Sequence, residues 1–236
     1  MMNSKIKGIK TIIKKGLSKI NNPYMSCSWG KDSIVLLYFL LQFKKDIKVI
    51  YLNSGYAFPE VYDFRDKIIK EWNINYIEIK NKIDYYELCK EIGLPHERSE
   101  CLQMKTVKSI KKNQLDEYAK QNNHDGVFWG IRSDESKKRK NLIKFKGNCF
   151  QDNTGFYKCS PLAYISNFDL WLIIDFLKIP YCDLYKKNKF FSREKLRNSG
   201  WMSTDGAWQG TIQHIRYYYP ELFQKLKNDF NLKEYV

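Results

Sequence analysis

The segment from Ser26 to Ser33, SCSWGKDS, constrains the fold more than any other part of this chain. It follows an apolar run at 23–28 that predicts a strand, and a helix pattern with apolar residues at 34–41 begins at Asp32. A strand that passes through a short loop into a helix aims the first N–H groups of that helix at a bound anion. The segment therefore predicts an α/β fold with a phosphate-binding loop at the carboxyl edge of its sheet.

Each residue of this loop has an expected role. Gly30 should let the backbone turn tightly and approach a phosphate. Ser28 and Ser33 supply hydroxyl donors, and Lys31 supplies a positive charge for a polyphosphate. Asp32 would repel phosphate unless a cation intervened, so we expect it either to cap the helix or to help hold Mg²⁺. The loop is not G-x-x-x-x-G-K-[ST], because Asp follows the lysine and one glycine is present.

Strands and helices alternate along the chain. Further strands are predicted at 47–53, 74–80 and 126–131, with short strand-like pieces at 142–145 and 156–159. Helices are predicted at 5–20, 59–72, 85–92, 103–122, 168–177 and 211–227, the last kinked or split by Pro220. This alternation predicts a mostly parallel sheet of about five strands with helices on both faces, and a mainly helical C-terminal lobe.

We divide the chain into three parts of one compact unit. We expect residues 1–22 to form an N-terminal basic amphipathic helix and residues 23–135 to form the nucleotide-binding core. We expect residues 136–236 to form a C-terminal lobe that binds substrate or anion. No run approaches 18 uncharged apolar residues, which argues against a membrane partner. No secretory signal is seen, so we expect a cytoplasmic protein with reduced thiols.

The net charge of +15 has two interpretations. In the first, the lysines are solvated and the charge needs no partner. In the second, the charge forms a surface that binds a polyanion. Residues 136–151 carry six basic residues and no acidic residue, and Lys105, Lys108 and Lys112 are spaced along one predicted helix. A DNA or RNA substrate therefore stays open, as does assembly into a homodimer or with a partner subunit.

The six cysteines contain no C-x-x-C pair, which argues against an iron–sulfur cluster built from local pairs. Cys101 begins a predicted helix, where the helix dipole lowers a thiol pKa and favours the thiolate. We therefore expect Cys101 to be the reactive thiol or sulfur carrier, if the chain has one.

Five blocks resemble, in order, the motifs of the phosphoadenosine phosphosulfate (PAPS) reductase family, a branch of the PP-loop N-type ATP pyrophosphatases. The first block, SWGKDS at 28–33, resembles the family's S-x-G-K-D-S. The other four are LNSGYAFPE at 52–60, ECLQMKTVK at 100–108, GIRSDESKKR at 130–139, and the segment 160–185 from SPLAY to IPYCDLY. Together the blocks span residues 24–185.

The resemblance implies a Rossmann-like adenine nucleotide α-hydrolase fold that uses ATP and Mg²⁺. It implies that the nucleotide phosphates are bound by Ser28, Gly30, Lys31, Asp32 and Ser33. It places Asn53, Ser54 and Gly55 beside the adenosine, and it assigns the binding of a second anionic group to Arg132, Lys137 and Arg139. Gly130 is also expected among the residues that bind the nucleotide. The implied catalytic residues are Lys31, Asp32, Arg132 and Cys101, with Asp32 as the metal ligand.

Departures from the family pattern direct the functional hypothesis. The last cysteine is Cys182, so the final 54 residues lack the C-terminal nucleophile of sulfite-forming reductases. The motifs that the chain retains are those that handle ATP in the family. They imply attack on the α phosphate of ATP, which would adenylylate an acceptor in sulfur transfer or in nucleic-acid modification. One alternative is a reductase that binds PAPS or adenylyl sulfate and uses Cys101 as an atypical thiol. Another is a non-catalytic nucleic-acid-binding protein on the same scaffold.

Overall fold

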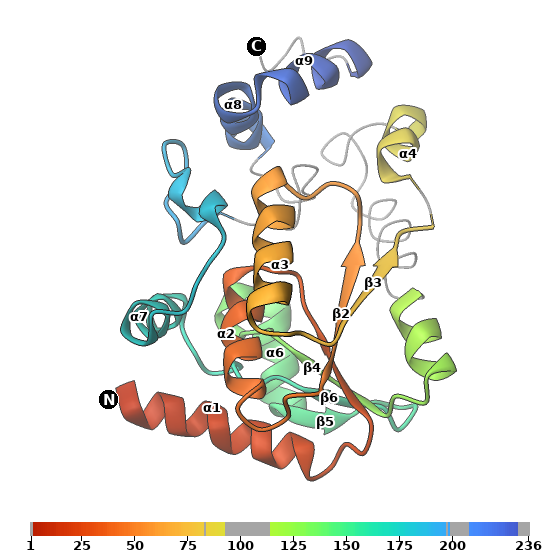
Figure 1. The fold of residues 1–236 in the computed structure, drawn as a ribbon, viewed down its shortest axis with the longest axis vertical. Helices are drawn as coiled ribbons and strands as arrows, with labels where there is room; N and C mark the ends of the chain where they lie inside the picture. The colour runs from red at the N-terminus through yellow and green to blue at the C-terminus, as the bar shows by residue number, and fades with distance from the viewer. Residues whose placement is uncertain (1, 83, 93–113, 197, 199–207, 231–236) are drawn as a thin grey trace.

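The fold is seen in a computed structural model (Figure 1) that describes residues 2–82, 84–92, 114–196, 198 and 208–230. Cys101 and the three lysines at 105, 108 and 112 lie outside the described residues.

Within the described residues the sheet has six strands, and five of them are parallel as predicted. Their spatial order is β3 (Tyr76–Lys80), β2 (Lys48–Asn53), β1 (Pro23–Ser26), β4 (Gly126–Trp129) and β6 (Tyr157–Cys159). The sixth strand, β5 (Cys149–Gln151), pairs antiparallel with β6 at the edge. Because the five strands run in one direction, their carboxyl ends share one edge of the sheet.

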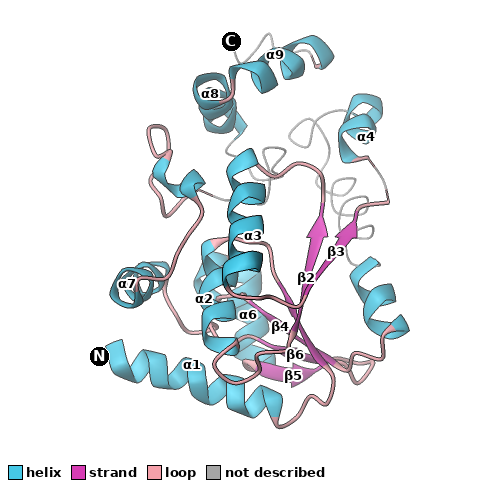
Figure 2. Ribbon diagram, in the orientation of Figure 1, coloured by secondary structure: helices cyan, strands magenta, loops and turns pink. Residues whose placement is uncertain are grey.

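Helices cover both faces of the sheet (Figure 2). The larger core packs β1 and β2 against α1 (Met2–Leu17), α2 (Lys31–Leu40), α3 (Pro59–Glu71) and α7 (Asn167–Leu177). On the other face, Tyr24, Ile50 and Val127 pack with Ala119 of a helix described over 114–121. Neighbouring residues Tyr24 and Met25 of β1 belong to opposite cores, as the alternation of side chains along a strand requires.

The basic segment after residue 136 differs from the prediction. The strand expected at 142–145 is wrong, because residues Lys137–Lys146 form helix α6. The hydroxyl of Ser136 accepts a hydrogen bond from the Arg139 N–H, and Gly147, at φ 80°, ends the helix. Ile143 is the buried residue of α6, so the helix has no apolar stripe that periodicity could reveal.

The last two helices and the segment around Lys187 contact the core through α3. Pro220 splits the last predicted helix as expected, into α8 (Trp208–Tyr218) and α9 (Pro220–Asp229). Glu60 accepts a hydrogen bond from the Tyr219 hydroxyl at 2.8 Å and forms an ion pair with Lys187. One hydrophobic core extends from Ile9 to residues of α9, so the lobe and the sheet share it.

The remaining elements are short. Helix α4 covers Tyr85–Ile92, and two 3-10 turns cover Ser133–Glu135 (η2) and Asp183–Lys186 (η3). Among the described residues, no helix combines the length and the apolar character that crossing a bilayer requires.

Candidate nucleotide-binding site

The loop at 28–33 turns at a different residue from the predicted one. Trp29 takes the left-handed conformation, at φ 61°, whereas Gly30 is extended, at φ −78°. The expectation that Gly30 makes the tight turn is therefore wrong. Gly30 is needed for space instead, because a Cβ there would lie 2.6 Å from Oδ1 of Asn198. The Asn198 amide thereby approaches the loop and donates to the Ser28 carbonyl at 3.0 Å.

Four neighbouring residues fix the first turn of α2: Ser28, Tyr185 and Gly130 contact it from other segments, and Ser33 lies within it. The hydroxyls of Ser28 and Ser33 lie 3.0 Å apart, and the Ser28 N–H donates to Ser33 Oγ at 3.2 Å. The Lys31 N–H donates to the Tyr185 hydroxyl at 3.2 Å. Gly130, after β4, packs on this turn, since a Cβ there would lie 3.1 Å from the carbonyl carbon of Asp32. First-turn N–H groups have no partner within their own helix, so this turn is suited to an anion.

Four charged residues meet beside this turn, and we call Lys31, Asp32, Arg132 and Asp134 the loop charge cluster. Lys31 Nζ donates to Asp32 Oδ2 at 3.1 Å, and Arg132 Nε donates to the other oxygen of Asp32. Arg132 Nη1 donates to Asp134 Oδ1 at 2.6 Å. The two cations are largely removed from water, since Lys31 and Arg132 are 7% and 3% exposed, whereas the Asp134 side chain is 37% exposed.

All three nitrogens of the Arg132 guanidinium donate hydrogen bonds. Besides the two carboxylates, it donates to the Ile165 carbonyl at 3.2 Å and to Asn167 Oδ1 at 3.4 Å. Burial opposes its charge, but the carboxylates of Asp32 and Asp134 outweigh burial and raise the pKa of Arg132. The geometry therefore makes Arg132 a residue that positions Asp32.

The other predicted residues are placed as follows. The N-cap position of α2 is Gly30, with no side-chain cap, so Asp32 does not cap the helix. Lys137 is exposed on α6, and Arg139 forms an ion pair with Glu135. Cys101 lies outside the described residues, so its assignment as a thiol nucleophile stays a prediction.

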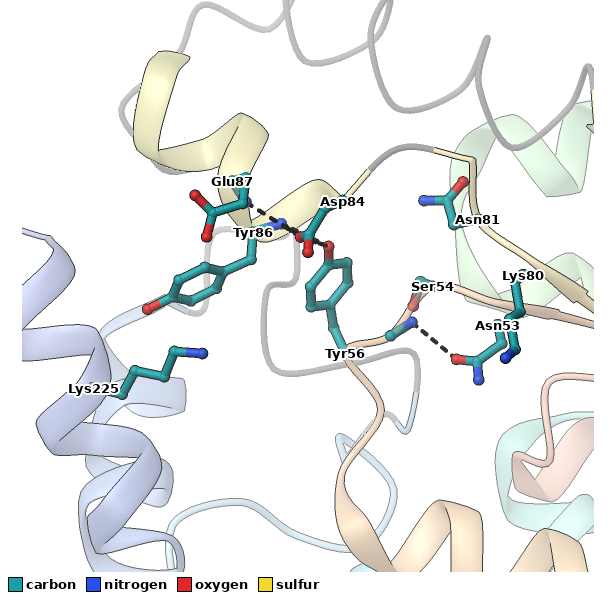
Figure 3. A pocket seen from close by; sticks show the side chains of 10 residues that line it. Asn53, Ser54, Tyr56, Lys80, Asn81, Asp84, Tyr86, Glu87 and Lys225 are labelled. Carbon is teal, nitrogen blue, oxygen red and sulfur yellow. Dashed lines mark hydrogen bonds between the residues drawn. The ribbon is translucent and has the colours of Figure 1, made fainter.

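Asn53, Ser54 and Gly55 line a cavity of about 400 Å³ at the carboxyl ends of β2 and β3 (Figure 3). Asn53 holds the turn, because its Oδ1 accepts from the Gly55 N–H at 2.9 Å. Asn81 Oδ1 is buried in this wall and has no hydrogen-bond partner within the described ranges. The other lining residues are Tyr56, Lys80, Asp84, Tyr86, Glu87 and Lys225.

Three residues of the site were not identified from the sequence: Tyr185, Asn198 and Asp134. Tyr185 lies in the last family-like block, so the motif marked this position, but nothing in the sequence indicated its contact with Lys31. Asp134 lies two residues after Arg132, within another block. Asn198 follows the blocks, and nothing in its local sequence links it to residue 28.

A family model described as the phosphoadenosine phosphosulfate reductase domain matches residues 22–219. An uncharacterized protein of Methanocaldococcus jannaschii is 28% identical over 229 residues, covering 95% of this chain and 44% of the relative. A phosphoadenosine 5'-phosphosulfate reductase of Xylella fastidiosa is 26% identical over 174 residues, covering 71% of this chain and 68% of the relative. The chain spans only 44% and 52% of the lengths of two M. jannaschii relatives.

Three solved structures show the same fold at low identity. A PAPS reductase from Candida auris in a phosphate complex has TM-score 0.58 and 18% identity, over 75% of this chain and 83% of that one. FMN adenylyltransferase of Candida glabrata with ATP has TM-score 0.53 and 15% identity, over 84% of this chain and 61% of that one. The U34-tRNA thiolase NcsA of Methanococcus maripaludis has TM-score 0.52 and 19% identity, over 99% of this chain and 81% of that one.

Proposed function

The chain belongs to the family of the phosphoadenosine phosphosulfate reductase domain, and from this premise we propose that it binds ATP at residues 28–33 and adenylylates an acceptor. The bond between the α and β phosphates of ATP is cleaved. The acceptor oxygen attacks the α phosphorus, and pyrophosphate leaves with the electron pair of the broken bond. Such a reaction needs positioning and charge neutralisation more than it needs a strong base.

The observation that carries this proposal is the buried Lys31 beside the first turn of α2. Its ammonium group is 3.1 Å from Asp32 Oδ2, and the hydroxyls of Ser28 and Ser33 adjoin the same turn. A polyphosphate can bind the N–H groups of the turn and draw Lys31 away from Asp32. Because Lys31 is largely shielded from water, its charge acts at a lower effective dielectric constant.

Asp32 is kept in position by Arg132 and is the described residue best suited to Mg²⁺. Mg²⁺ in nucleotide sites uses one or two carboxylates together with phosphate oxygens, and Asp32 supplies one such carboxylate. When bound there, the ion would neutralise charge on the phosphates. Among the described residues, no group of three His, Cys, Asp or Glu side chains forms a metal site independent of the nucleotide.

A nucleic-acid acceptor is favoured by helix α6. Its ten residues include five lysines and Arg139 but no acid, and the lysines are exposed. Phe145 of the same helix is 76% exposed, so an aromatic ring stands among the positive charges. Positive charge with an exposed ring is what single-stranded nucleic acid binds. We therefore propose RNA as the first acceptor to test, with sulfate as the second.

The deciding experiment measures ATP binding by calorimetry and pyrophosphate release with RNA, sulfate or no acceptor. We expect Lys31→Ala to weaken ATP binding at least tenfold. The matched control is Lys67→Ala, which removes an exposed lysine of α3 and should bind like the parent. If the parent chain fails to bind ATP, or if both variants bind equally, the proposal is wrong. Sulfite release from PAPS with a thiol donor would instead support the reductase that uses Cys101.

A further inference from the structure

Two cysteines face each other across the antiparallel edge of the sheet. Cys149 of β5 is directly opposite Cys159 of β6. The flanking backbone bonds run from the Ser160 N–H to the Asn148 carbonyl, at 2.7 Å, and from the Asp152 N–H to the Phe156 carbonyl, at 2.9 Å. Hydrogen-bonded and non-hydrogen-bonded pairs alternate along such a ladder.

The flanking bonds identify the register at the cysteines. Asn148–Ser160 and Asp152–Phe156 are hydrogen-bonded pairs, so Cys149–Cys159 is a non-hydrogen-bonded pair, with Cα atoms expected about 4.5 Å apart. Directly opposite residues in such a pair present their side chains on the same face of the sheet. A separation of this size is within the range of about 4.4–6.8 Å that a disulfide spans.

Helix α1 covers the pair and leaves room for it. The Cys159 thiol lies 3.8 Å from the Ile12 carbonyl, and a Cβ at Gly16 would lie 2.8 Å from the Cys159 sulfur. Cys159 is fully buried, whereas Cys149 is only half-buried. A small-molecule oxidant therefore reaches Cys149 first.

The surroundings favour a thiolate at Cys149. A hydrogen bond from Cys159, with the positive charges of Lys19 and Lys15, lowers the pKa of Cys149 to about 7. In the same pair the pKa of Cys159 is raised, because its thiol donates to Cys149 and is buried. The more exposed sulfur is thus also the better nucleophile near neutral pH.

We infer that Cys149 and Cys159 form a reversible redox-active dithiol, with Cys149 as the attacking thiol and Cys159 as the resolving thiol. The co-reactant class is a small-molecule disulfide such as oxidised glutathione. The Cys149 thiolate attacks one glutathione sulfur and releases one glutathione thiolate, which takes up a proton. Cys159 then loses its proton and attacks the Cys149 sulfur, releasing the second glutathione. The protein pair loses two electrons, and the glutathione disulfide gains them.

The inference is independent of the proposed function, because its test needs no nucleotide. The folded chain in a Cys101→Ser background is incubated with oxidised glutathione and alkylated. It is then digested without reduction and analysed by mass spectrometry. We expect a peptide that joins Cys149 to Cys159, which disappears after treatment with dithiothreitol.

Single variants separate the two roles. In Cys159→Ser, the glutathione adduct should accumulate on Cys149, whereas Cys149→Ser should leave Cys159 unmodified. The matched control is Cys182→Ser, which removes a buried thiol elsewhere and should still form the linked peptide.

Three outcomes would overturn the assignment. The linked peptide could be missing from the folded parent chain, or the adduct could form equally on Cys27 and Cys182. The adduct could also fail to accumulate on Cys149 in Cys159→Ser. The measurements on the parent chain decide the question even if a variant folds poorly.

Discussion

The loop charge cluster and helix α6 both carry positive charge, but their surroundings differ. In the cluster, Arg132 is 3% exposed and contacts two carboxylates, a carbonyl and an amide oxygen. On α6, five lysines are exposed, and Arg139, with 41% of its side chain exposed, pairs with Glu135. The same kind of charge is therefore held in one geometry in the first region and is solvated in the second.

The difference determines what each region can do. Buried charges must be paired, and removing one partner leaves the other uncompensated, which costs about 3–5 kcal/mol. Exposed charges cost little and contribute little to stability, but they add up to a field that attracts a polyanion. The contacts of Arg132 thus fix the position of Asp32, whereas the exposed lysines of α6 contribute a field that salt weakens.

The largest effect is expected for Arg132→Met. Because the change removes a buried cation from Asp32 and Asp134, whose side chains are 18% and 37% exposed, we expect the free energy of unfolding to fall by about 3 kcal/mol, the lower end of the range for a fully buried pair. The matched change Arg139→Met removes the exposed pair with Glu135 and should cost at most about 1 kcal/mol. Urea unfolding of both variants measures the difference. Equal losses would remove the distinction between the two regions.

His214 of α8 tests what burial does to a charge that is attracted by Glu60 only at a distance and has no hydrogen-bond partner among the described residues. It is 2% exposed, it lies among Phe58, Tyr218 and Tyr219, and neither ring nitrogen has a hydrogen-bond partner among the described residues. Burial, with a smaller effect of Lys187, lowers the pKa of His214 to about 4.

The sign of the pH dependence follows from this shift. Between about pH 6.5 and pH 4 the unfolded chain binds a proton at His214 and the folded chain does not. Stability should therefore fall as the pH falls through this range, by at most about 3 kcal/mol, since one pKa unit is about 1.4 kcal/mol. In His214→Phe, unfolding at pH 7 and pH 4 should differ less than in the parent. An unchanged pH dependence in the variant would show that His214 does not titrate in this way.

A smaller loss is expected for Gly30→Ala, which tests whether the loop needs space rather than a turn. The new Cβ would lie 2.6 Å from Asn198 Oδ1 and break the bond from Asn198 to the Ser28 carbonyl. We expect a loss of about 1–2 kcal/mol. In the Asn198→Ala background, Gly30→Ala should cost less, because the clashing oxygen is gone. Simple additivity of the two changes would contradict the steric explanation.

The smallest effect on stability, within about 0.5 kcal/mol, is expected for the double change of Lys138→Ala and Lys144→Ala on α6. Its effect should appear in RNA binding instead. The slope of log affinity against log salt should fall by about 0.7 for each lysine that contacts a single-stranded phosphate. The matched control, Lys67→Ala with Lys70→Ala on α3, should leave the slope unchanged. A slope that both pairs change equally would mean that α6 is not a specific contact surface.

Much of the fold could be predicted from local pattern. Apolar runs separated by helix-length segments identified the five parallel strands, because a buried parallel strand needs apolar residues on both faces. The motif SWGKDS placed the loop between β1 and α2 for the same local reason. Helix α6 was missed, because its lysines conceal any periodicity and its single buried residue, Ile143, gives no stripe.

The sequence predicted which residues form the candidate site better than it predicted what each of them contacts. Lys31, Asp32 and Arg132 were all named from motifs, but the motifs did not show that Arg132 holds Asp32; its binding of an anion stays a prediction. The contact with Asp32 depends on residues 165 and 167 folding back over the guanidinium, a contact between segments more than 30 residues apart.

The sequence by itself determined the four strands and the helices before residue 132, the phosphate loop and the family resemblance, because these depend on residues close together in the chain. Only the tertiary structure decided that Gly30 makes room for Asn198, that Tyr185 contacts the Lys31 amide and that Cys149 faces Cys159. Each of these depends on which distant segments become neighbours, and in a close-packed interior the shape of the whole chain decides that.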